Sequence, residues 1–156
     1  MATLSTLLAP DLMTPGSTWQ LLSSINGFAR STGNSLTTQA CPGRRFQLLG
    51  RDRSRLQVQL LEDGYRCWVP IDELLGQAKQ CIPWRPPQLT EAEIQRRLPA
   101  VQSWSARAEQ QVNRYLWGGT TEPDMDCSGL MQMAFASQGI WIPRDAYQQE
   151  RFCQPV

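Results

Sequence analysis

The segment whose residue types most suggest chemistry is Asp-Cys-Ser-Gly-Leu, which begins at Asp126. Asp126 is a favoured N-cap residue, so a helix is predicted to begin at Cys127. Free amides and the dipole at a helix N-terminus stabilise an anion, and a thiol at such a position acts as a nucleophile near neutral pH. Gly129 leaves space beside the sulfur, and Gly118 and Gly119 let other backbone come close. The alternative interpretation is a buried structural cysteine on an amphipathic helix.

The sequence of 156 residues contains no histidine. A mechanism that needs a histidine base, metal ligand or pH switch is therefore not complete within these residues. The five cysteines include no Cys-x-x-Cys pair, so neither a zinc site nor a thioredoxin-like redox motif is predicted. We also predict no cofactor. Their odd number argues against a disulfide framework and favours free thiols in a reducing compartment.

The composition excludes several classes of protein. A hydrophobic fraction of 41% and a charged fraction of 19% do not fit a disordered chain. A net charge of +1 does not indicate nucleic acid or an anionic membrane as a partner. No basic residue precedes Arg30, and no apolar run reaches the ~18 residues that a membrane span needs. We therefore expect a cytoplasmic protein with no signal peptide and no membrane-spanning segment.

Short strands are predicted within residues 18–82, after an irregular lead-in at residues 1–17. Residues 56–60 read Leu-Gln-Val-Gln-Leu and alternate strictly, which is typical of a half-buried strand. The turn Glu62-Asp63-Gly64 then predicts a hairpin. Together these segments, at this spacing, predict a small closed β-barrel. The expected strands are 19–22, 25–29, 36–40, 45–49, 56–60 and 65–69.

A stiff proline-rich linker is predicted at residues 83–89, where three prolines occur within Pro-Trp-Arg-Pro-Pro. The pattern becomes helical in residues 90–156. Thr90 and Glu93 form the sequence pattern of a capping box. Pro99 is expected to open a longer helix from its first position. The apolar stripe expected on that helix consists of Val101, Trp104, Ala108 and Val112.

Two further helices are predicted after the glycine pair. The first covers residues 127–138 and is ended by Gly139. The second begins at Pro143 and includes Asp145, Ala146 and Tyr147.

Three motifs, in this order and spacing, closely resemble those of the NlpC family, which are papain-like cysteine peptidases that cut bacterial cell-wall peptides. They are Tyr115-Leu-Trp-Gly-Gly, Asp126-Cys-Ser-Gly-Leu and Gly139-Ile-Trp-Ile-Pro-Arg-Asp-Ala-Tyr-Gln-Gln. The barrel and linker resemble the bacterial SH3-like barrel that precedes the catalytic domain in a cyanobacterial type. The resemblance runs from about Trp19 to Val156. It implies an α+β chain in which an SH3-like β-barrel precedes the helical front part of a papain-like peptidase domain.

The family resemblance implies a γ-D-glutamyl-L-diamino-acid endopeptidase acting on murein peptides with a free N-terminal L-alanine, of the L-alanyl-γ-D-glutamyl-diaminopimelate type. Cys127 matches the nucleophile. Asp126 and Ser128 match residues that hold the amino group and backbone of the substrate. Tyr115 matches a tyrosine beside the oxyanion site, and Trp117 matches a wall of the pocket.

The resemblance extends to three more residues. Arg144 and Asp145 match a pair that shapes the entrance beside the cysteine, and Tyr65 resembles a barrel tyrosine that closes over the L-alanine. Simpler interpretations stay open for all of these residues. The acidic residue at 126 could be only a helix cap, the aromatic residues could be core or sheet packing, and the Arg-Asp pair could be a solvated helix start.

The sequence departs from the family in one respect that affects its chemistry. The family completes its site with a histidine base and a third polar group on strands downstream, and no histidine follows Cys127 here. We therefore expect a truncated peptidase that lacks this sheet and is inactive alone. The apolar helix faces that carry Trp104, Leu130, Phe135 and Trp141 would then have nothing to pack against. The alternatives are a murein-peptide binding remnant and an SH3-like protein-interaction module.

Overall fold

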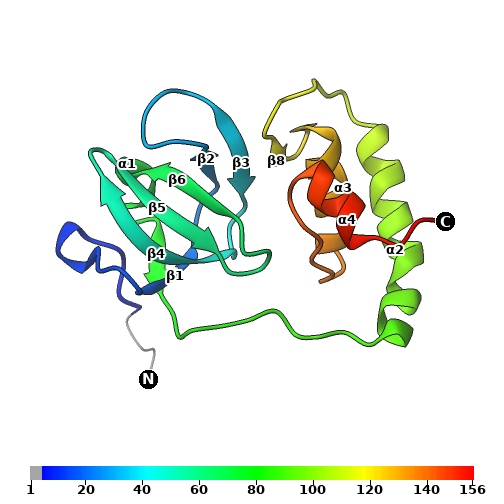
Figure 1. Ribbon diagram of the computed structural model, residues 1–156, viewed down its shortest axis with the longest axis horizontal. Coiled ribbons are helices and arrows are strands. Elements are labelled where there is room, and N and C mark those ends of the chain that lie inside the picture. The colour runs from blue at the N-terminus through cyan, green and yellow to red at the C-terminus, as the bar shows by residue number, and fades with distance from the viewer. Residues whose placement is uncertain (1–4) are drawn as a thin grey trace. The chain divides into compact units, whose positions relative to one another are not determined.

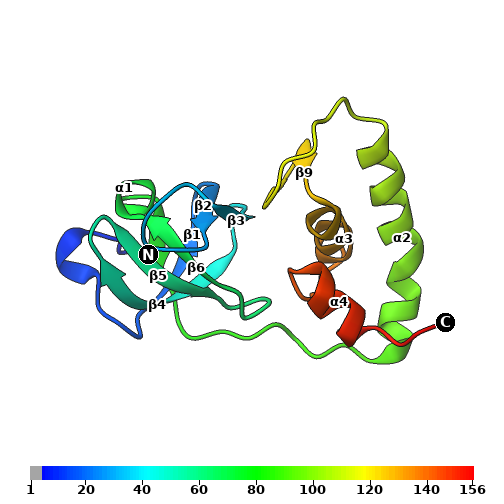
Figure 2. The same ribbon diagram turned by 45° about the horizontal axis from the view of Figure 1, so that its top comes forward.

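The computed structural model describes residues 5–156 and divides between Arg85 and Pro86 into two compact units (Figures 1 and 2). The first unit, residues 5–85, contains a curled antiparallel sheet of seven strands. The second unit, residues 86–156, contains helices and a two-stranded hairpin. The chain is thus mixed α/β, with its strands mainly in the first unit and its longer helices in the second.

The sheet of the first unit has the order β3-β2-β6-β5-β4-β1-β7, and the strands recorded as neighbours are antiparallel. This hydrogen-bonded order has β3 and β7 as its outer strands, so the closed barrel predicted from the sequence is not confirmed. A short helix, α1 (Ile71–Leu74), follows β6. The strands are β1 (Thr18–Leu21), β2 (Ile25–Phe28), β3 (Leu36–Ala40), β4 (Arg45–Asp52), β5 (Arg55–Leu60), β6 (Arg66–Pro70) and β7 (Ala78–Gln80).

The alternation in residues 56–60 has the predicted result. Leu56, Val58 and Leu60 are fully buried, while the glutamines between them are only half-buried. The six predicted strands are confirmed, with small shifts at their ends. β7 was missed because three residues show no periodicity, although it pairs with β1 through Leu21 and Ala78.

Part of the predicted lead-in is ordered against this sheet. It contains a short 3-10 helix, η1 (Pro10–Leu12), and Leu8 is buried in the apolar core. Residues 1–4 of the lead-in lie outside the described residues.

The second unit begins with α2 (Glu91–Glu109), and the predicted capping box at its start is confirmed. The Glu93 amide donates to the Thr90 hydroxyl, and the Thr90 amide donates to the Glu93 carboxylate at 2.7 Å. The prediction that Pro99 opens a helix is wrong, because Pro99 lies inside α2. Its ring removes one backbone hydrogen bond. Packing of Ile94 before it and Val101 after it keeps the helix continuous.

Shorter elements follow α2. The hairpin of β8 (Thr120–Thr121) and β9 (Asp124–Met125) was not predicted, because two-residue strands leave no pattern in the sequence. After it come α3 (Cys127–Ala136) and α4 (Ala146–Phe152). The predicted start of the last helix at Pro143 is wrong, because Asp145 is the N-cap and the helix begins at Ala146. Gly139 has a φ of 71°, as a helix-ending glycine requires, so its predicted role is confirmed.

The helices of the second unit bury a small apolar core. Val101 of α2, Ala134 of α3, Ile140 and Ile142 are buried, with Trp104 and Phe135 partly buried against them. The expectation that the helix faces have nothing to pack against is therefore wrong for Trp104 and Phe135. The helices cover one another. Val112 is 96% exposed and does not belong to the predicted stripe.

Candidate active site

Cys127 is the first residue of α3, and its side chain is exposed. Asp126 is the N-cap, and its side chain accepts a hydrogen bond from the Gly129 amide at 2.7 Å. The predicted helix start is thus confirmed, and the alternative of a buried structural cysteine is wrong. A solvent-accessible thiol at a helix N-terminus has the position of an attacking group.

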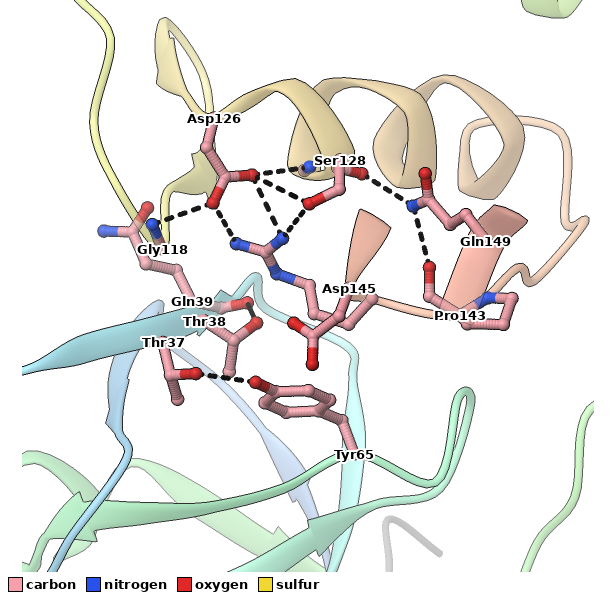
Figure 3. A network of polar contacts seen from close by, with 12 residues as sticks. Thr37, Thr38, Gln39, Tyr65, Gly118, Asp126, Ser128, Pro143, Asp145 and Gln149 are labelled. Atoms are coloured by element: carbon pink, nitrogen blue, oxygen red, sulfur yellow. Dashed lines mark hydrogen bonds and ion pairs between the residues drawn. The ribbon is translucent and has the colours of Figure 1, made fainter. Parts of the chain in front are cut away.

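The Asp126 carboxylate is the centre of a buried polar network (Figure 3). Arg144 contacts both of its oxygens, Nη1 to Oδ1 at 3.0 Å and Nη2 to Oδ2 at 2.9 Å. The Gly118 amide donates to Oδ2 at 2.8 Å, and the Ser128 hydroxyl donates to Oδ1 at 3.3 Å. With the Gly129 amide, five hydrogen bonds converge on one carboxylate. They connect two separate chain segments, at Gly118 and Arg144, and the first turn of α3 to the residue before Cys127.

These contacts change the acidity of Asp126. Burial opposes ionisation, but the hydrogen bonds from Arg144 and from the Gly129 and Gly118 amides, with the charge of Arg144, outweigh it. The pKa of Asp126 therefore lies below its ordinary value. The carboxylate is charged at neutral pH and paired with a buried guanidinium.

Two glycines allow this packing. A Cβ at Gly129 would overlap the carbonyl oxygen of Gly119. A Cβ at Gly119 would lie 2.6 Å from the carbonyl oxygen of Asp124 and 3.0 Å from that of Leu116. The glycines therefore bring the first turn of α3 against the strand segment before it. The prediction that Gly129 leaves space for the Cys127 sulfur is therefore wrong, because the Gly119 backbone fills that space.

Tyr115 and Trp117, which the sequence analysis named as site residues, lie before β8 and are exposed by 64% and 74%. The pKa of Tyr115 is raised by desolvation, then by the charge of Cys127 and a hydrogen bond with its side chain, and by the charge of Asp126. A hydrogen bond with the Cys127 backbone acts in the opposite direction. The Tyr115 phenol is thus within hydrogen-bonding distance of the Cys127 thiol. The pocket role of Trp117 stays a prediction.

Two glutamines that were not predicted as site residues connect α3 to α4 and to the segment between them. Nε2 of Gln149 in α4 donates to the carbonyl oxygens of Ser128 at 2.9 Å and Pro143 at 2.8 Å (Figure 3). Nε2 of Gln132 in α3 donates to the carbonyl oxygen of Ile142 at 3.0 Å. Gln149 was visible only as the last residue of a motif. No local spacing shows that its amide reaches a residue 21 positions earlier.

Asp145, predicted to shape the entrance with Arg144, is the N-cap of α4. Its backbone amide lies 3.5 Å from Oε1 of Gln148. Arg144 itself is 2% exposed and points into the Asp126 network. The two neighbours in sequence therefore have different surroundings, and their shared role at an entrance stays a prediction.

Tyr65 belongs to the first unit. Its hydroxyl and the hydroxyl of Thr37 are 2.6 Å apart, and its ring packs against the apolar core (Figure 3). Its backbone amide donates to Oδ1 of Asp63 at 3.1 Å, and Asp63 pairs with Arg44 at 3.0 Å. Buried charges thus fix the hairpin that carries Tyr65. Its contact with substrate stays a prediction.

The other thiols differ from Cys127 in environment. Burial, and to a smaller extent the charge of Asp63, raise the pKa of Cys67 to about 12, while Arg44 acts in the opposite direction. Cys153 is exposed like Cys127, but it is the C-cap of α4.

In the described part of the chain, no three His, Cys, Asp or Glu side chains gather as a metal site would require. Within residues 5–156, no helix combines the length and apolar character needed to cross a membrane.

Comparison with known proteins finds a family match in each of the two units. Residues 112–155 match the NlpC/P60 family, and residues 28–74 match the bacterial dipeptidyl-peptidase SH3 domain. The chain therefore combines a domain of the NlpC/P60 family with a bacterial SH3 domain.

One curated relative is the bifunctional muramidase/DL-endopeptidase CwlT of Bacillus subtilis (strain 168). It is 53% identical over 36 residues, which are 22% of this chain and 11% of that protein. The match thus spans about a tenth of the length of the relative.

Two solved structures from Trichomonas vaginalis are also similar. NlpC2 is 12% identical with a TM-score of 0.42, and the match covers 92% of this chain and 75% of that one. NlpC1 is 13% identical with a TM-score of 0.44, and the match covers 100% of this chain and 74% of that one.

Proposed function

We propose that this chain carries the nucleophile of a cell-wall peptide cysteine endopeptidase. The observation that supports this most is the exposed Cys127 thiol at the N-terminus of α3, directly after the Asp126 cap. It lies in the segment that matches the NlpC/P60 family. The DL-endopeptidase activity in the name of the Bacillus relative supports the same class of reaction.

In the proposed reaction, the Cys127 thiolate attacks the carbonyl carbon of a γ-D-glutamyl amide. The electron pair of the carbonyl moves to oxygen, and the Tyr115 phenol, which lies at the thiol, is suited to donate a hydrogen bond to that oxygen. Collapse of the intermediate breaks the amide C–N bond and leaves a thioester, and the departing amine of the L-diamino acid takes a proton from water. Water then hydrolyses the thioester and frees the thiol.

The proposed substrate is a murein peptide with a free N-terminal L-alanine, of the L-alanyl-γ-D-glutamyl-diaminopimelate type. We assign recognition of its amine and backbone to Asp126 and Ser128, and closure over the L-alanine to Tyr65 of a first unit that we take to be SH3-like. Asp126 already receives five hydrogen bonds, so an ammonium group would have to share or replace one of them.

The proposal includes a limit on turnover. The 156 residues contain no histidine to take the thiol proton or return it to the leaving amine. General acid–base help is typically worth ~10²–10⁴-fold. We therefore expect no measurable hydrolysis of the tripeptide by this chain alone. Turnover that is lost in Cys127→Ala would contradict this expectation.

A trapping experiment tests the proposed function without requiring turnover. An L-alanyl-γ-D-glutamyl chloromethyl ketone carries a reactive carbon where the scissile amide would be, and the attacking thiolate displaces chloride to form a thioether. We expect this probe to label Cys127 well before Cys153 and to be outcompeted by the free peptide. The γ-L-glutamyl epimer is the matched control. Equal labelling by both epimers, or labelling mainly at Cys153, would contradict the proposed substrate class.

The missing histidine favours one alternative function, a murein-peptide binding module that does not cleave. Such a module would bind the tripeptide, while Cys127 would react with the D-probe no faster than with its epimer. Calorimetric titration of the unmodified chain with the tripeptide, run beside the trapping experiment, distinguishes the two functions.

A further inference from the structure

The start of α3 combines two requirements that conflict electrostatically. As the N-cap, a carboxylate at position 126 satisfies a free amide and interacts favourably with the helix dipole. The next residue is the proposed nucleophile, which reacts as a thiolate. A negative charge beside a thiol disfavours its ionised form. An unpaired Asp126 would therefore help the helix and hinder the nucleophile.

The geometry of Arg144 resolves this conflict. Its guanidinium meets both oxygens of Asp126, and Nη1 also donates to Oγ of Ser128 at 2.9 Å. The Arg144 side chain is 1% exposed, and that of Asp126 is 10% exposed. A bidentate pair with so little contact with water is screened weakly and holds its geometry. The carboxylate keeps its capping hydrogen bond while its charge is balanced.

We propose that Arg144 is a positioning residue that balances the charge of Asp126 beside Cys127 and so keeps the thiol reactive near neutral pH. This inference rests on the proposed function, because it takes Cys127 as the nucleophile. It gives Arg144 a task that differs from the entrance role predicted from the sequence.

The elements packed around α3 carry other charged or titratable groups that could affect Asp126 and Cys127. Tyr115 lies at the thiol, and its raised pKa reflects desolvation and then the charges of Cys127 and Asp126. Arg97 of α2 donates to the carbonyl oxygen of Gln138, beyond the opposite end of α3. Asp124 of β9 accepts from the Arg114 amide. Those on α4 and its cap are Asp145, Tyr147, Glu150 and Arg151. Among the described residues, Arg144 is the basic group in ion-pair contact with Asp126.

The test measures the rate at which iodoacetamide alkylates Cys127 in the full chain as a function of pH, with Cys153 as an internal reference. In Arg144→Met we expect the midpoint of the Cys127 profile to rise by about one pH unit, and the rate at pH 7 to fall roughly tenfold. The matched control is Arg151→Met, which removes the same charge from an exposed position on α4. It should leave the Cys127 midpoint unchanged.

A double variant separates charge balance from structural support. Asp126→Asn with Arg144→Met removes both charges, so charge balance predicts that the Cys127 midpoint returns to near the wild-type value. A purely structural role predicts no return, because the double variant also lacks the ion pair. A wild-type midpoint in Arg144→Met, or a raised midpoint in the double variant, would overturn the proposal.

Two further observations keep the test decisive. If Arg144→Met unfolds the second unit, Arg144→Lys is used, and it should keep the wild-type midpoint because it keeps the charge. A raised midpoint in the lysine variant would overturn the proposal. If wild-type Cys127 reacts no faster than Cys153, the proposed function fails. If Cys127 is reactive in the wild type and equally so in Arg144→Met, only the role of Arg144 fails.

Discussion

The two units of the chain differ in the size of their apolar cores. Within residues 5–156, the apolar core cluster of the first unit contains fourteen buried side chains, whereas that of the second unit contains four. The second unit adds the polar network around Asp126, which Arg144, Gly118 and Ser128 complete. Apolar burial is non-directional, while a hydrogen-bonded ion pair requires one geometry. The first unit also holds a buried ion-pair cluster, Arg44 with Glu62 and Asp63, so the units differ in the size of their apolar cores and not in whether they use polar contacts.

The comparison predicts that the largest stability effects come from the core of the first unit. Phe46→Ala removes a fully buried ring from β4 and should lower the free energy of unfolding by about 3–5 kcal/mol. The matched control is Phe152→Ala in α4, where the ring is 63% exposed and the change should stay within about 0.5 kcal/mol. Urea unfolding, with amide exchange to follow each unit separately, would measure the change in the free energy of unfolding for both variants. Equal losses in the two variants would break the comparison.

A smaller loss is expected from Gly129→Ala in the second unit. The added Cβ would overlap the Gly119 carbonyl oxygen, so the first turn of α3 must shift. Overpacking of this kind costs about 1–3 kcal/mol. We also expect slower alkylation of Cys127, because the thiol moves with the turn. Gly50→Ala is the control, since a Cβ there meets nothing within 4 Å. Unchanged alkylation in Gly129→Ala would show that the glycine contact does not position Cys127.

Acidification should affect the second unit through Asp126. The folded-state pKa of Asp126 lies below its ordinary value, so its stabilising contribution is complete above about pH 4 and is lost as the pH falls through the folded-state pKa. Amide exchange in α3 and α4 should therefore speed up as the pH falls below about 4, relative to β4 and β5, after correction for intrinsic rates. Asp126→Asn should flatten this dependence. The same dependence in Asp126→Asn would mean that another carboxylate is responsible.

The smallest predicted change concerns the start of α2. Thr90→Ala removes the side-chain half of the capping box and should cost about 1 kcal/mol, seen as faster amide exchange in the first turn. Hydrogen bonds from Thr90 also hold the pKa of Glu93 below its ordinary value, so the effect should diminish in acid. Ser103→Ala, whose hydroxyl donates to the Pro99 carbonyl oxygen within α2, should change little. Equal effects of the two variants would argue against the cap.

The sequence predicted what local patterns encode. Alternation predicted the strand around Val58, and Asp126 predicted the helix start at Cys127. The prediction for Pro99 failed because a local rule was outweighed by packing on both sides of the proline. The Arg144–Asp126 pair joins residues 18 positions apart, and its geometry depends on how α3 and the segment before α4 meet. No spacing rule gives that contact, so the sequence led to separate predicted roles, Asp126 at the substrate amine and Arg144 at the entrance beside the cysteine.

The most direct test of the central claim compares the two exposed thiols of the second unit. Cys127 lies at the N-terminus of α3, among the free amides of a helix start, whereas Cys153 lies at the C-terminal end of α4. Limiting iodoacetamide near pH 7 with peptide mapping should label Cys127 first, Cys153 later and the buried Cys67 last. Equal labelling of Cys127 and Cys153, or earlier labelling of Cys153, would contradict the assignment of Cys127 as the nucleophile.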